Sequence, residues 1–385
     1  MYTKNYDSER SGQYANAGQS INKTKNELLY LFIFSVLTIT ALGLWNLYSA
    51  SFSMPGIFNV QIRHISVALI SAVVIGFVIP IKYFKHYGYP IYVISVLMLL
   101  IVVINGHTSN GSTRWLKFGP VGIQPSELAK IAVTIVVAKF FSDYSVGGTY
   151  RLRDMIPVLL MVGLVFALIF IQPDFGTAGI CLLIAVSQIA FVRIDLRSIA
   201  AVVGTGVLMI PVGWYVLLRG YQKTRILMMF NPELDPHGKG YNSIQSLVAI
   251  GSGQSFGKGF MQGTQTQLQF LPARHTDFVF SVFAEEHGFW FGTGLFILYA
   301  ISTICMIEMA RGLKDTFSSL ICIGIGAMIF SQFFINIAMV LGIFPVVGMT
   351  LPFFSFGGSS FLTLGIGAGL VIAAKRQKTA FRKSM

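Results

Sequence analysis

The segment RHTDFVFSVFAEEHG, residues 274–288, carries a dense group of ionisable side chains at the start of a long apolar run. Asp277, Ser281 and Glu285 recur at every fourth position, so we expect them to share one face of a helix. An aspartate at the start of such a run can accept a proton from a hydroxyl as a general base. It can also cap the first turn of the helix. The spacing alone is compatible with both functions of Asp277.

An ionisable side chain inside an apolar segment is costly and is therefore a candidate for function. Arg63 opens such a segment in NVQIRHI, and Glu127 and Lys130 stand three positions apart in QPSELAKIAV, on one helix face. Pro125 and Ser126 favour a helix start there, with Ser126 as the cap. The pair can form an internal salt bridge. Because two of the three charges are positive, one cation can instead meet an anionic ligand such as a pyrophosphate.

Two other patterns resemble known sites without matching them. GSGQSFGKG, residues 251–259, resembles a phosphate-binding loop, but its lysine is followed by glycine where that motif needs Ser or Thr. His275, Asp277 and His287 could coordinate a metal ion, but their spacing matches no zinc motif. We therefore expect neither an ATP site nor a protein-held zinc ion. Whether Asp277 holds a different metal ion stays open.

The composition indicates which elements position these residues. The chain has 385 residues, of which 54% are hydrophobic and only 11% are charged, and its mean hydropathy is +0.69. A soluble domain carries about 25% charged residues, so an ordinary globular enzyme, a disordered protein and a nucleic-acid binder are excluded. The three cysteines lie in apolar runs and show no metal or disulfide pattern. The sequence predicts an all-α polytopic integral membrane protein.

The apolar runs predict ten transmembrane helices. A bilayer core about 30 Å thick needs about 20 apolar residues per helix, and ten runs approach or exceed that length. The first run is too long for a signal-peptide core and follows a polar leader, so we expect an uncleaved anchor. The ten predicted spans are residues 28–49, 64–80, 88–104, 126–142, 155–171, 177–192, 198–218, 289–309, 317–341 and 353–374. Because the apolar run after Asp277 is too long for one straight span, we expect a break at Gly288.

Lysine and arginine residues decide the orientation, because cytoplasmic loops are enriched in them. With the N-terminus inside, the inner segments hold 18 of the 28 Lys and Arg residues, against four near the short outer loops. Both termini are therefore predicted to be cytoplasmic. We divide the chain into a disordered tail over residues 1–27, a membrane domain over 28–374 and a basic cytoplasmic tail over 375–385. The extracytoplasmic loop over 219–276, between the seventh and eighth helices, is long enough to predict a function, and its periodicity predicts short helices.

Five segments, taken together and in this order, resemble the SEDS family, the RodA, FtsW and SpoVE group of shape, elongation, division and sporulation proteins. The segments are GSTRWLKFGPVGIQPSELAK (111–130), QPDFGTA (172–178), NPELDPHGKGYNSIQS (231–246), GTQTQLQFLPARHTDFVFSVFAEEHG (263–288) and FPVVGMTLPFFSFGGSS (344–360). GTQTQLQFLP and the short N-terminus are more similar to the RodA type than to FtsW. Phe356, Thr350 and Ala273 depart from the family pattern, but none of them is one of its motif acids.

The resemblance implies a peptidoglycan glycosyltransferase that polymerises lipid II at the outer face of the bacterial cytoplasmic membrane. It implies a ten-helix fold, a class B penicillin-binding protein as transpeptidase partner and an elongation machinery of the MreB, MreC and MreD type. No nucleic-acid partner is expected. By motif match, Asp277 takes the place of the catalytic acid. The residues expected to bind or support the substrate are Arg63, Arg114, Trp115, Glu127, Lys130, Arg274, His275 and Glu285.

The implied reaction joins the 4-hydroxyl of an acceptor GlcNAc to C1 of a MurNAc whose leaving group is polyprenyl pyrophosphate, with inversion at that carbon. One such displacement needs a base for the hydroxyl and positive charge for the leaving group. Asp277 is the expected base, and Arg63, Lys130 or Arg274 could stabilise the pyrophosphate. A divalent cation, Mg²⁺ or Mn²⁺, could share that task, and Asp277 could hold it. No organic cofactor is expected.

Three other functions compete with a polymerase of cell elongation. Intramembrane charges on ten helices also suit a flippase that transports lipid II. Such transporters typically consist of two halves with similar sequence patterns, and this sequence shows no such internal repeat. A septal polymerase of FtsW type would use the same chemistry during division. A non-catalytic scaffold for cell-wall synthesis would have no use for an acid-bearing cavity. We therefore expect a polymerase that acts in elongation and rod-shape maintenance.

Overall fold

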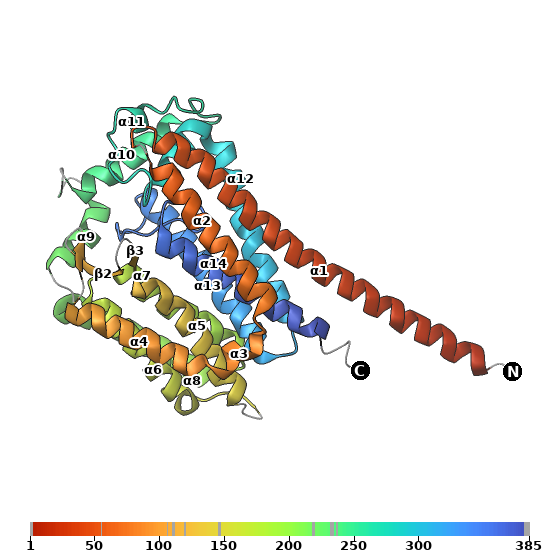
Figure 1. Cartoon of the computed structure of the whole chain (residues 1–385). Coiled ribbons are helices and arrows are strands. Elements are labelled where there is room, and N and C mark those ends of the chain that lie inside the picture. Colours follow the sequence, from red (N-terminus) through yellow and green to blue (C-terminus); the bar gives the residue numbers. More distant parts are fainter. Residues whose placement is uncertain are drawn as a thin grey trace.

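Helices make up most of the computed structural model of the chain. The structure describes residues 3–54, 56–105, 107–109, 112–118, 121–144, 148–217, 220–231, 235 and 238–380. Most of its long helices run roughly side by side in one bundle (Figure 1). The predicted class, a mainly helical chain, is confirmed.

Every segment predicted as a membrane span contains a helix. These helices are α1 (Thr3–Ala50), α2 (Ile57–Val73, extended by a π-helical turn, Val74–Val78), α4 (Gly88–Asn105), α5 (Pro125–Asp143), α6 (Leu152–Ile171), α7 (Phe175–Phe191), α8 (Leu196–Val212, extended by a π-helical turn, Gly213–Leu217), α12 (Val279–Gly312), α13 (Thr316–Val340) and α14 (Gly358–Ala380). Within the described residues, six are long and apolar enough to cross a membrane: α1 from Asn26, α2 with its π-helical turn, α6, α12, α13 and α14. The chain is a multi-pass membrane protein.

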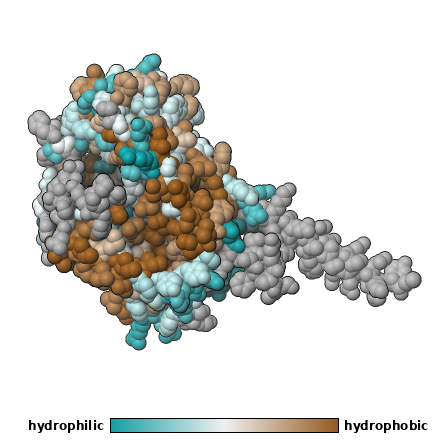
Figure 2. Space-filling view, viewed as in Figure 1, coloured by the Kyte–Doolittle hydropathy of each residue, from teal (hydrophilic) through white to brown (hydrophobic). Residues whose placement is uncertain are grey.

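The surface has the character that a bilayer requires. Figure 2 shows a broad area of hydrophobic side chains across the middle of the molecule, with hydrophilic side chains above and below it. Large apolar side chains are exposed on α2, α6 and α13, for example Ile70, Leu160 and Phe334. A soluble protein rarely exposes apolar patches of more than a few hundred Å². Lipid contact explains why these residues are tolerated on the outside.

The first helix begins earlier than its hydropathy predicts. The sequence predicts a disordered tail over residues 1–27, whereas the structure continues α1 to Thr3. The polar part before Asn26 contains no proline that would interrupt a helix. The part that is apolar enough to cross a membrane covers Asn26–Ala50, close to the predicted span over 28–49.

The centre of the bundle is formed by α5, α13 and α14, which are buried over most of their length. Small residues allow this close packing. A Cβ at Gly324 of α13 would lie 2.6 Å from the side chain of Thr134 on α5, and a Cβ at Gly365 of α14 would lie 2.4 Å from the carbonyl oxygen of Ala68 on α2. Gly365 and Gly369 form a GxxxG pattern, which is typical of closely packed membrane helices, and both glycines lie against α2.

The predicted outer segments are folded. Between α4 and α5, a three-stranded antiparallel sheet consists of β1 (His107–Ser109), β2 (Ser112–Phe118) and β3 (Val121–Ile123), in that order. The all-α prediction missed it, because strands this short show too little alternation to be recognised. The long loop between α8 and α12 contains α9 (Gly220–Phe230), α10 (Lys239–Ser252) and α11 (Thr264–Gln267), which confirms the short helices predicted there. A further short helix, α3 (Ile81–His86), precedes α4.

A break in α12 separates its first turns from the rest of the helix. The helix has 34 residues, about 50 Å at 1.5 Å per residue, which is longer than the apolar core of a bilayer. Gly288 interrupts it with φ 77° and ψ −171°, a conformation that favours glycine. The predicted break at Gly288 is confirmed. The helix begins at Val279, ten residues before the predicted span.

Candidate active site

A cavity of about 500 Å³ lies where α5, α7 and α13 meet the loop before α12, the segment before α14 and the small sheet. It brings together three of the predicted site residues, Asp277, Glu127 and Trp115. The prediction did not include several other polar side chains that line it, among them His64, Asp174 and Gln332.

Asp277 reaches the cavity from the loop that precedes α12. Asn336 on α13 holds its backbone, because the side-chain Nδ2 donates to the carbonyl oxygen of Asp277 at 2.9 Å and to that of Met349 at 2.5 Å. Gly348 has φ 74°, and a Cβ there would lie 3.3 Å from Oδ2 of Asp277. The loop before α12 and the segment before α14 therefore meet around this carboxylate.

The predicted helical stripe of Asp277, Ser281 and Glu285 is wrong. Asp277 lies outside α12, which begins at Val279. Ser281 instead shares a hydrogen bond with Ser246 of α10, at 2.9 Å between the hydroxyl oxygens. Glu285 points to the outer loop rather than to the cavity. The prediction was wrong because residues four positions apart share a face only within a helix, and α12 starts two residues after Asp277.

Glu127 and Lys130 form the internal salt bridge that was one of the two expectations. Lys130 Nζ lies 2.8 Å from Oε1 of Glu127, and both residues are buried. Glu127 lines the cavity, whereas Lys130 is fully buried and does not. The second carboxylate oxygen of Glu127, Oε2, has no hydrogen-bond partner among the described residues. Of the pair, Glu127 therefore belongs to the cavity wall and the Lys130 cation does not.

Asp174 joins two helices at the wall of the cavity. Its Oδ1 accepts a hydrogen bond from the backbone N–H of Thr177 and so caps α7. Its Oδ2 accepts hydrogen bonds from Gln124 Nε2 at 3.2 Å and from the Ser126 hydroxyl at 3.3 Å. Ser126, expected as the cap of α5, serves this contact instead, and Gln124 is the residue that precedes the helix. The aspartate lies between two apolar runs in QPDFGTA, a pattern that typically marks a cap.

Arg63 is exposed on α2, and its neighbour His64 reaches the cavity in its place. A Cβ at Gly358, at the start of α14, would lie 2.8 Å from His64 Nε2, so the imidazole lies against the backbone there. His64 and His275 both lie beside Phe356, with ring centroids 5.6 and 5.9 Å from it. The predicted Arg63 thus lies next to the cavity rather than on its wall.

Arg274 and His275 hold the loop before α12 in place. The buried Arg274 donates from Nε to the carbonyl oxygen of Ala50 at 2.8 Å and from Nη2 to the Ser53 hydroxyl at 2.6 Å. His275 accepts, through its backbone carbonyl, a hydrogen bond from the N–H of Phe356 at 3.0 Å. Burial lowers the pKa of the Arg274 guanidinium, and burial together with the Arg274 charge lowers the pKa of the His275 imidazole. Neither residue lines the cavity.

Trp115 lines the cavity from β2, and Gly122 of β3 lies against its ring, since a Cβ there would come within 3.3 Å of it. The small sheet therefore supplies one aromatic wall of the cavity. The side chain of Arg114, the neighbouring predicted residue, lies outside the described part of the structure.

Glu285 is an anchor for the outer loop. The buried carboxylate accepts hydrogen bonds from Lys258 Nζ at 2.7 Å, from the Thr264 hydroxyl at 3.1 Å and from the backbone N–H of Gln265 at 3.1 Å. The glycine-rich segment 251–259 packs with its backbone on α12, and a Cβ at Gly257 would lie 2.2 Å from the carbonyl oxygen of Glu286. The glycines thus allow close packing against α12. This agrees with the expectation that the segment is not a phosphate-binding loop.

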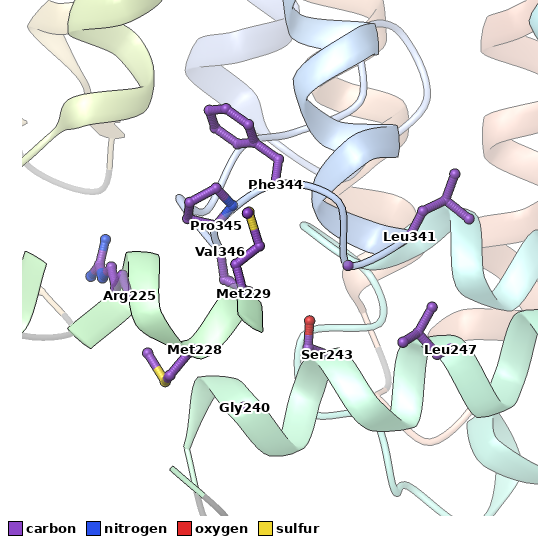
Figure 3. Close-up of a pocket in the computed structure, with 11 residues that line it drawn as sticks. Arg225, Met228, Met229, Gly240, Ser243, Leu247, Leu341, Phe344, Pro345 and Val346 are labelled. Carbon is purple, nitrogen blue, oxygen red and sulfur yellow. The ribbon is translucent and has the colours of Figure 1, made fainter. Parts of the chain in front are cut away.

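A second, smaller pocket of about 100 Å³ lies between α9, α10 and the segment after α13. Figure 3 shows Met228 and Met229 of α9 on one side of it and Phe344 and Val346 on another. Among the described residues that line this pocket, Arg225 is the single ionisable side chain, so none of them could act as a base at neutral pH. The cavity that is lined by Asp277, Glu127 and Asp174 is therefore the candidate active site.

The side chains of the cavity decide whether a metal ion would fit there. Among the described residues, no group of three His, Cys, Asp or Glu side chains could hold a metal ion. Mg²⁺ commonly binds through one or two carboxylates, while phosphate oxygens and water complete its shell. Asp277 and Glu127 both line the cavity. A divalent cation therefore fits as an ion shared with a phosphate-bearing ligand, and not as one held by the protein alone.

The fold and the cavity define a multi-pass helical membrane protein with a carboxylate-lined cavity between its central helices. The chain belongs to the FTSW_RODA_SPOVE family of cell cycle proteins, whose family model matches residues 29–380. This is the family that the five sequence segments resemble.

Relatives across this family are similar over most of their length. The peptidoglycan glycosyltransferase MrdB of Escherichia coli K12 is 36% identical over 368 residues, which cover 93% of this chain and 95% of MrdB. The stage V sporulation protein E of Bacillus subtilis is 35% identical over 371 residues, covering 92% of this chain and 98% of that protein.

Two solved structures have the same fold. A chain of a peptidoglycan synthase complex, described as coordinating polymerization and crosslinking, superimposes with a TM-score of 0.78 at 31% identity and covers 90% of this chain and 97% of its own length. The rod shape determining protein RodA of Thermus thermophilus superimposes with a TM-score of 0.68 at 28% identity, covering 90% of this chain and 96% of that chain.

Proposed function

We propose that this protein is a peptidoglycan glycosyltransferase that polymerises lipid II into β-1,4 glycan strands. The observation that carries the proposal is the cavity in which Asp277, Glu127 and Asp174 meet between the central helices. The whole-length similarity to a peptidoglycan glycosyltransferase supports the same activity. A cavity with carboxylates can deprotonate a sugar hydroxyl, and a surrounding bilayer can keep the polyprenyl tail of the substrate in lipid.

The cavity faces the outer side of the bacterial cytoplasmic membrane in this proposal, with ten membrane-spanning helices and both termini in the cytoplasm. The distribution of Lys and Arg supports that orientation. The sheet between α4 and α5 and the loop before α12 border the cavity, and both belong to the segments that this topology assigns to the outside. The substrate sugars and the growing glycan then lie on the side where the cell wall is built.

In the reaction, the oxygen of the acceptor 4-hydroxyl forms a bond to C1 of the MurNAc donor. The bond between C1 and the pyrophosphate oxygen breaks, and polyprenyl pyrophosphate leaves with its electron pair. The hydroxyl proton passes to the Asp277 carboxylate, and the configuration at C1 inverts. A base positioned in this way contributes about 10²–10⁴-fold to the rate. Asn336 and Gly348 position Asp277 by fixing the two chain segments around it.

Positive charge for the leaving group comes from the edge of the cavity. Of the three cations considered, Lys130 is buried in its pair with Glu127, and Arg274 is buried against the end of α1. Arg63 is exposed beside His64, so it can reach a pyrophosphate at the cavity mouth. Asp277 and Glu127 are the carboxylates that would hold a divalent cation, Mg²⁺ or Mn²⁺. When bound, such an ion neutralises charge on the pyrophosphate.

We place the activity in cell elongation, in complex with a class B penicillin-binding protein that crosslinks the new strands. The RodA-type segment GTQTQLQFLP and the structural similarity to RodA support the elongation role over the septal one. The similarity to a chain of a peptidoglycan synthase complex supports the partner. An elongation machinery of the MreB, MreC and MreD type would then position the pair along the cell.

The test separates a polymerase from a lipid II flippase. A flippase changes only the side on which lipid II lies, so it has no measurable product without two compartments. A glycosyltransferase forms a covalent bond and needs only its substrate, its site and its cation. The purified protein with its partner, in detergent and with Mg²⁺ or Mn²⁺, should convert lipid II into long glycan chains on a gel. Failure of a well-folded preparation of the complex to form polymer would refute the proposal and favour transport.

A further inference from the structure

A group of basic side chains lies at the end of the helix bundle away from the cavity. The helices α5 and α14 both begin at the cavity wall, where Glu127 and Gly358 lie. From there α5 continues for 19 residues, about 28 Å. The short helix α3 contacts both helices, and it lies on the opposite side of the molecule from α10 and α11 (Figure 1). We call the four cations of this region the basic cluster, which consists of Lys82, Lys85, Lys139 and Arg376.

Three cations of the basic cluster lie over exposed aromatic rings. The distances between the charged group and the ring centre are 4.8 Å for Arg376 over Phe77, 5.0 Å for Lys139 over Tyr89 and 5.4 Å for Lys82 over Tyr83. All three aromatic side chains are exposed. Exposed aromatic rings are favoured at the level of the lipid headgroups, where a cation beside the ring can reach a phosphate.

The basic cluster carries more positive charge than its acid can neutralise. Lys85 Nζ and Lys139 Nζ share the carboxylate of Asp143, at 3.7 and 3.0 Å. Lys82 and Arg376 are exposed, and neither forms an ion pair among the described residues. The cluster therefore attracts an anion.

Arg376 is held in place by the helix bundle. Its Nη1 donates a hydrogen bond to the carbonyl oxygen of Gly76, in the π-helical turn that follows α2, at 2.8 Å. The guanidinium is thus fixed between α14 and this turn, beside the exposed apolar side chains of Phe77 and Val78. A ligand bound here meets a positioned charge and an apolar surface together. A phospholipid matches both, because its phosphate group is attached directly to its acyl chains through glycerol.

The general enrichment of cations on the cytoplasmic side does not explain this arrangement. That rule predicts an excess of Lys and Arg in the inner segments without regard to their neighbours. Arg311, near the end of α12, follows the rule in this way, since it is paired with Glu308 at 2.6 Å and lies over no aromatic ring among the described residues. In the basic cluster, unneutralised charge and exposed rings from three neighbouring segments of the chain meet instead.

We infer that the basic cluster binds the phosphate group of an anionic phospholipid in the cytoplasmic leaflet of the membrane. Basic pockets between membrane helices on this side bind such headgroups in other proteins. The acyl chains then lie against Phe77 and Val78, on the exposed face of the π-helical turn. The inference uses the proposed orientation of the chain and does not depend on the proposed reaction.

Lipid titration of the purified full-length protein in detergent tests the inference, with bound lipid counted by native mass spectrometry. The wild type should bind phosphatidylglycerol more tightly than phosphatidylcholine, which has no net charge. The double variant Lys82→Gln with Arg376→Gln should bind phosphatidylglycerol about 25-fold more weakly, because each cation near the membrane surface contributes about fivefold. Its affinity for phosphatidylcholine should not change.

The double variant Arg311→Gln with Lys314→Gln is the matched control. It also removes two positive charges from the predicted cytoplasmic side, but outside the basic cluster, so its affinity for phosphatidylglycerol should stay close to that of the wild type. Lys82→Gln alone is the second variant, in case the loss of the hydrogen bond to Gly76 lowers the melting temperature. Lys82 forms no hydrogen bond or ion pair among the described residues, and its loss should weaken binding about fivefold.

Three results would overturn the inference. Equal affinity of the wild type for the two lipids would show that charge is not recognised, and an equal loss in the control variant would show that the cations act without regard to position. Displacement of phosphatidylglycerol by excess inorganic phosphate, which has no acyl chain, would indicate a site for soluble anions. Polymer formation from lipid II is measured separately, so failure here leaves the proposed function untouched.

Discussion

The three carboxylates of the cavity are attached in three different ways. Glu127 is paired with the buried Lys130, and Asp174 caps α7 while it accepts hydrogen bonds from α5 and the residue before it. Asp277 belongs to a loop whose backbone is fixed by Asn336. Because the three carboxylates have different structural roles, we expect their substitution to have different effects on activity and on stability.

Asp277→Asn should abolish glycan polymerisation while the melting temperature in detergent stays close to that of the wild type. Asparagine keeps the shape of the side chain but does not accept a proton at neutral pH, and a lost general base costs about 10²–10⁴-fold in rate. Polymer formed from lipid II is the measurement. Residual polymerisation near the wild-type rate would remove Asp277 from the mechanism.

Glu127→Ala should damage the fold as well as the activity. It leaves the Lys130 ammonium buried without its partner, which costs about 3–5 kcal/mol for a buried pair. Thermal unfolding in detergent should show a clear drop in melting temperature. The double variant with Lys130→Met is the control, because it removes the stranded charge and should recover much of the stability. An inactive Glu127→Ala protein that melts like the wild type would instead indicate direct contact with the substrate.

At the scale of elements, the outer end of α12 depends on glycine. Gly288 has φ 77°, and a Cβ there would lie 2.3 Å from the backbone nitrogen of Gly257. The break in α12 and the glycine-rich segment 251–259 therefore pack so closely that neither leaves room for a side chain at Gly288 or Gly257. Glu285 adds the polar attachment, through Lys258 and the two residues that follow Gly263.

Gly288→Ala should destabilise the protein, because alanine is strained at this φ, at a cost of about 1–3 kcal/mol, and its Cβ would also clash with the loop. Gly294 lies on the same helix, has a negative φ and would place a Cβ in open space. Gly294→Ala should therefore keep or slightly raise the melting temperature, because alanine favours the helix. Equal melting temperatures for the two variants would show that the break is not needed.

Sequence patterns predicted the positions of the helices better than their ends. Long apolar runs are a strong signal for membrane helices, and each predicted span does contain a helix. The start of α12 at Val279 and that of α14 at Gly358 were misplaced, because tertiary contacts of flanking polar and aromatic segments decide them. Asp277 and Glu127 could be predicted because a charge stands out in an apolar run. Gln332 could not, because an uncharged polar residue there usually serves packing, and only its place on a cavity wall distinguishes it.

At the scale of the whole molecule, the face that is proposed to lie outside the membrane combines the cavity with a large folded loop. The helices α9, α10 and α11 lie in this loop, and Phe256 beyond α10 exposes 78% of its surface. Val248, Leu268 and Phe270 of the same loop are exposed as well, and several exposed apolar side chains outside the predicted spans suit contact with another protein. The transpeptidase domain of a class B penicillin-binding protein would lie on this side of the membrane.

A photo-crosslinking amino acid at position 256 should capture the penicillin-binding protein in cells that express both proteins. The same amino acid at Tyr144, an exposed residue after α5 on the predicted cytoplasmic side, is the control and should capture no such partner. Crosslinked products are identified by mass spectrometry. Absence of the partner at position 256 and at the exposed Val248 would refute the outer loop as the contact surface.

The C-terminal end of α1 and the residues just after it contact the chain on both sides of Asp277. Ala50 and Ser53 accept hydrogen bonds from Arg274, three residues before the acid, and Ser49 donates to Glu286, nine residues after it. The segment that carries Asp277 is thus attached to one end of α1 at two points, Arg274 and Glu286. Both attachments go to the same end of α1, so the position of this helix end sets the position of the segment that carries Asp277. α1 therefore helps to fix the place of the reacting group, although none of its described side chains lines the cavity.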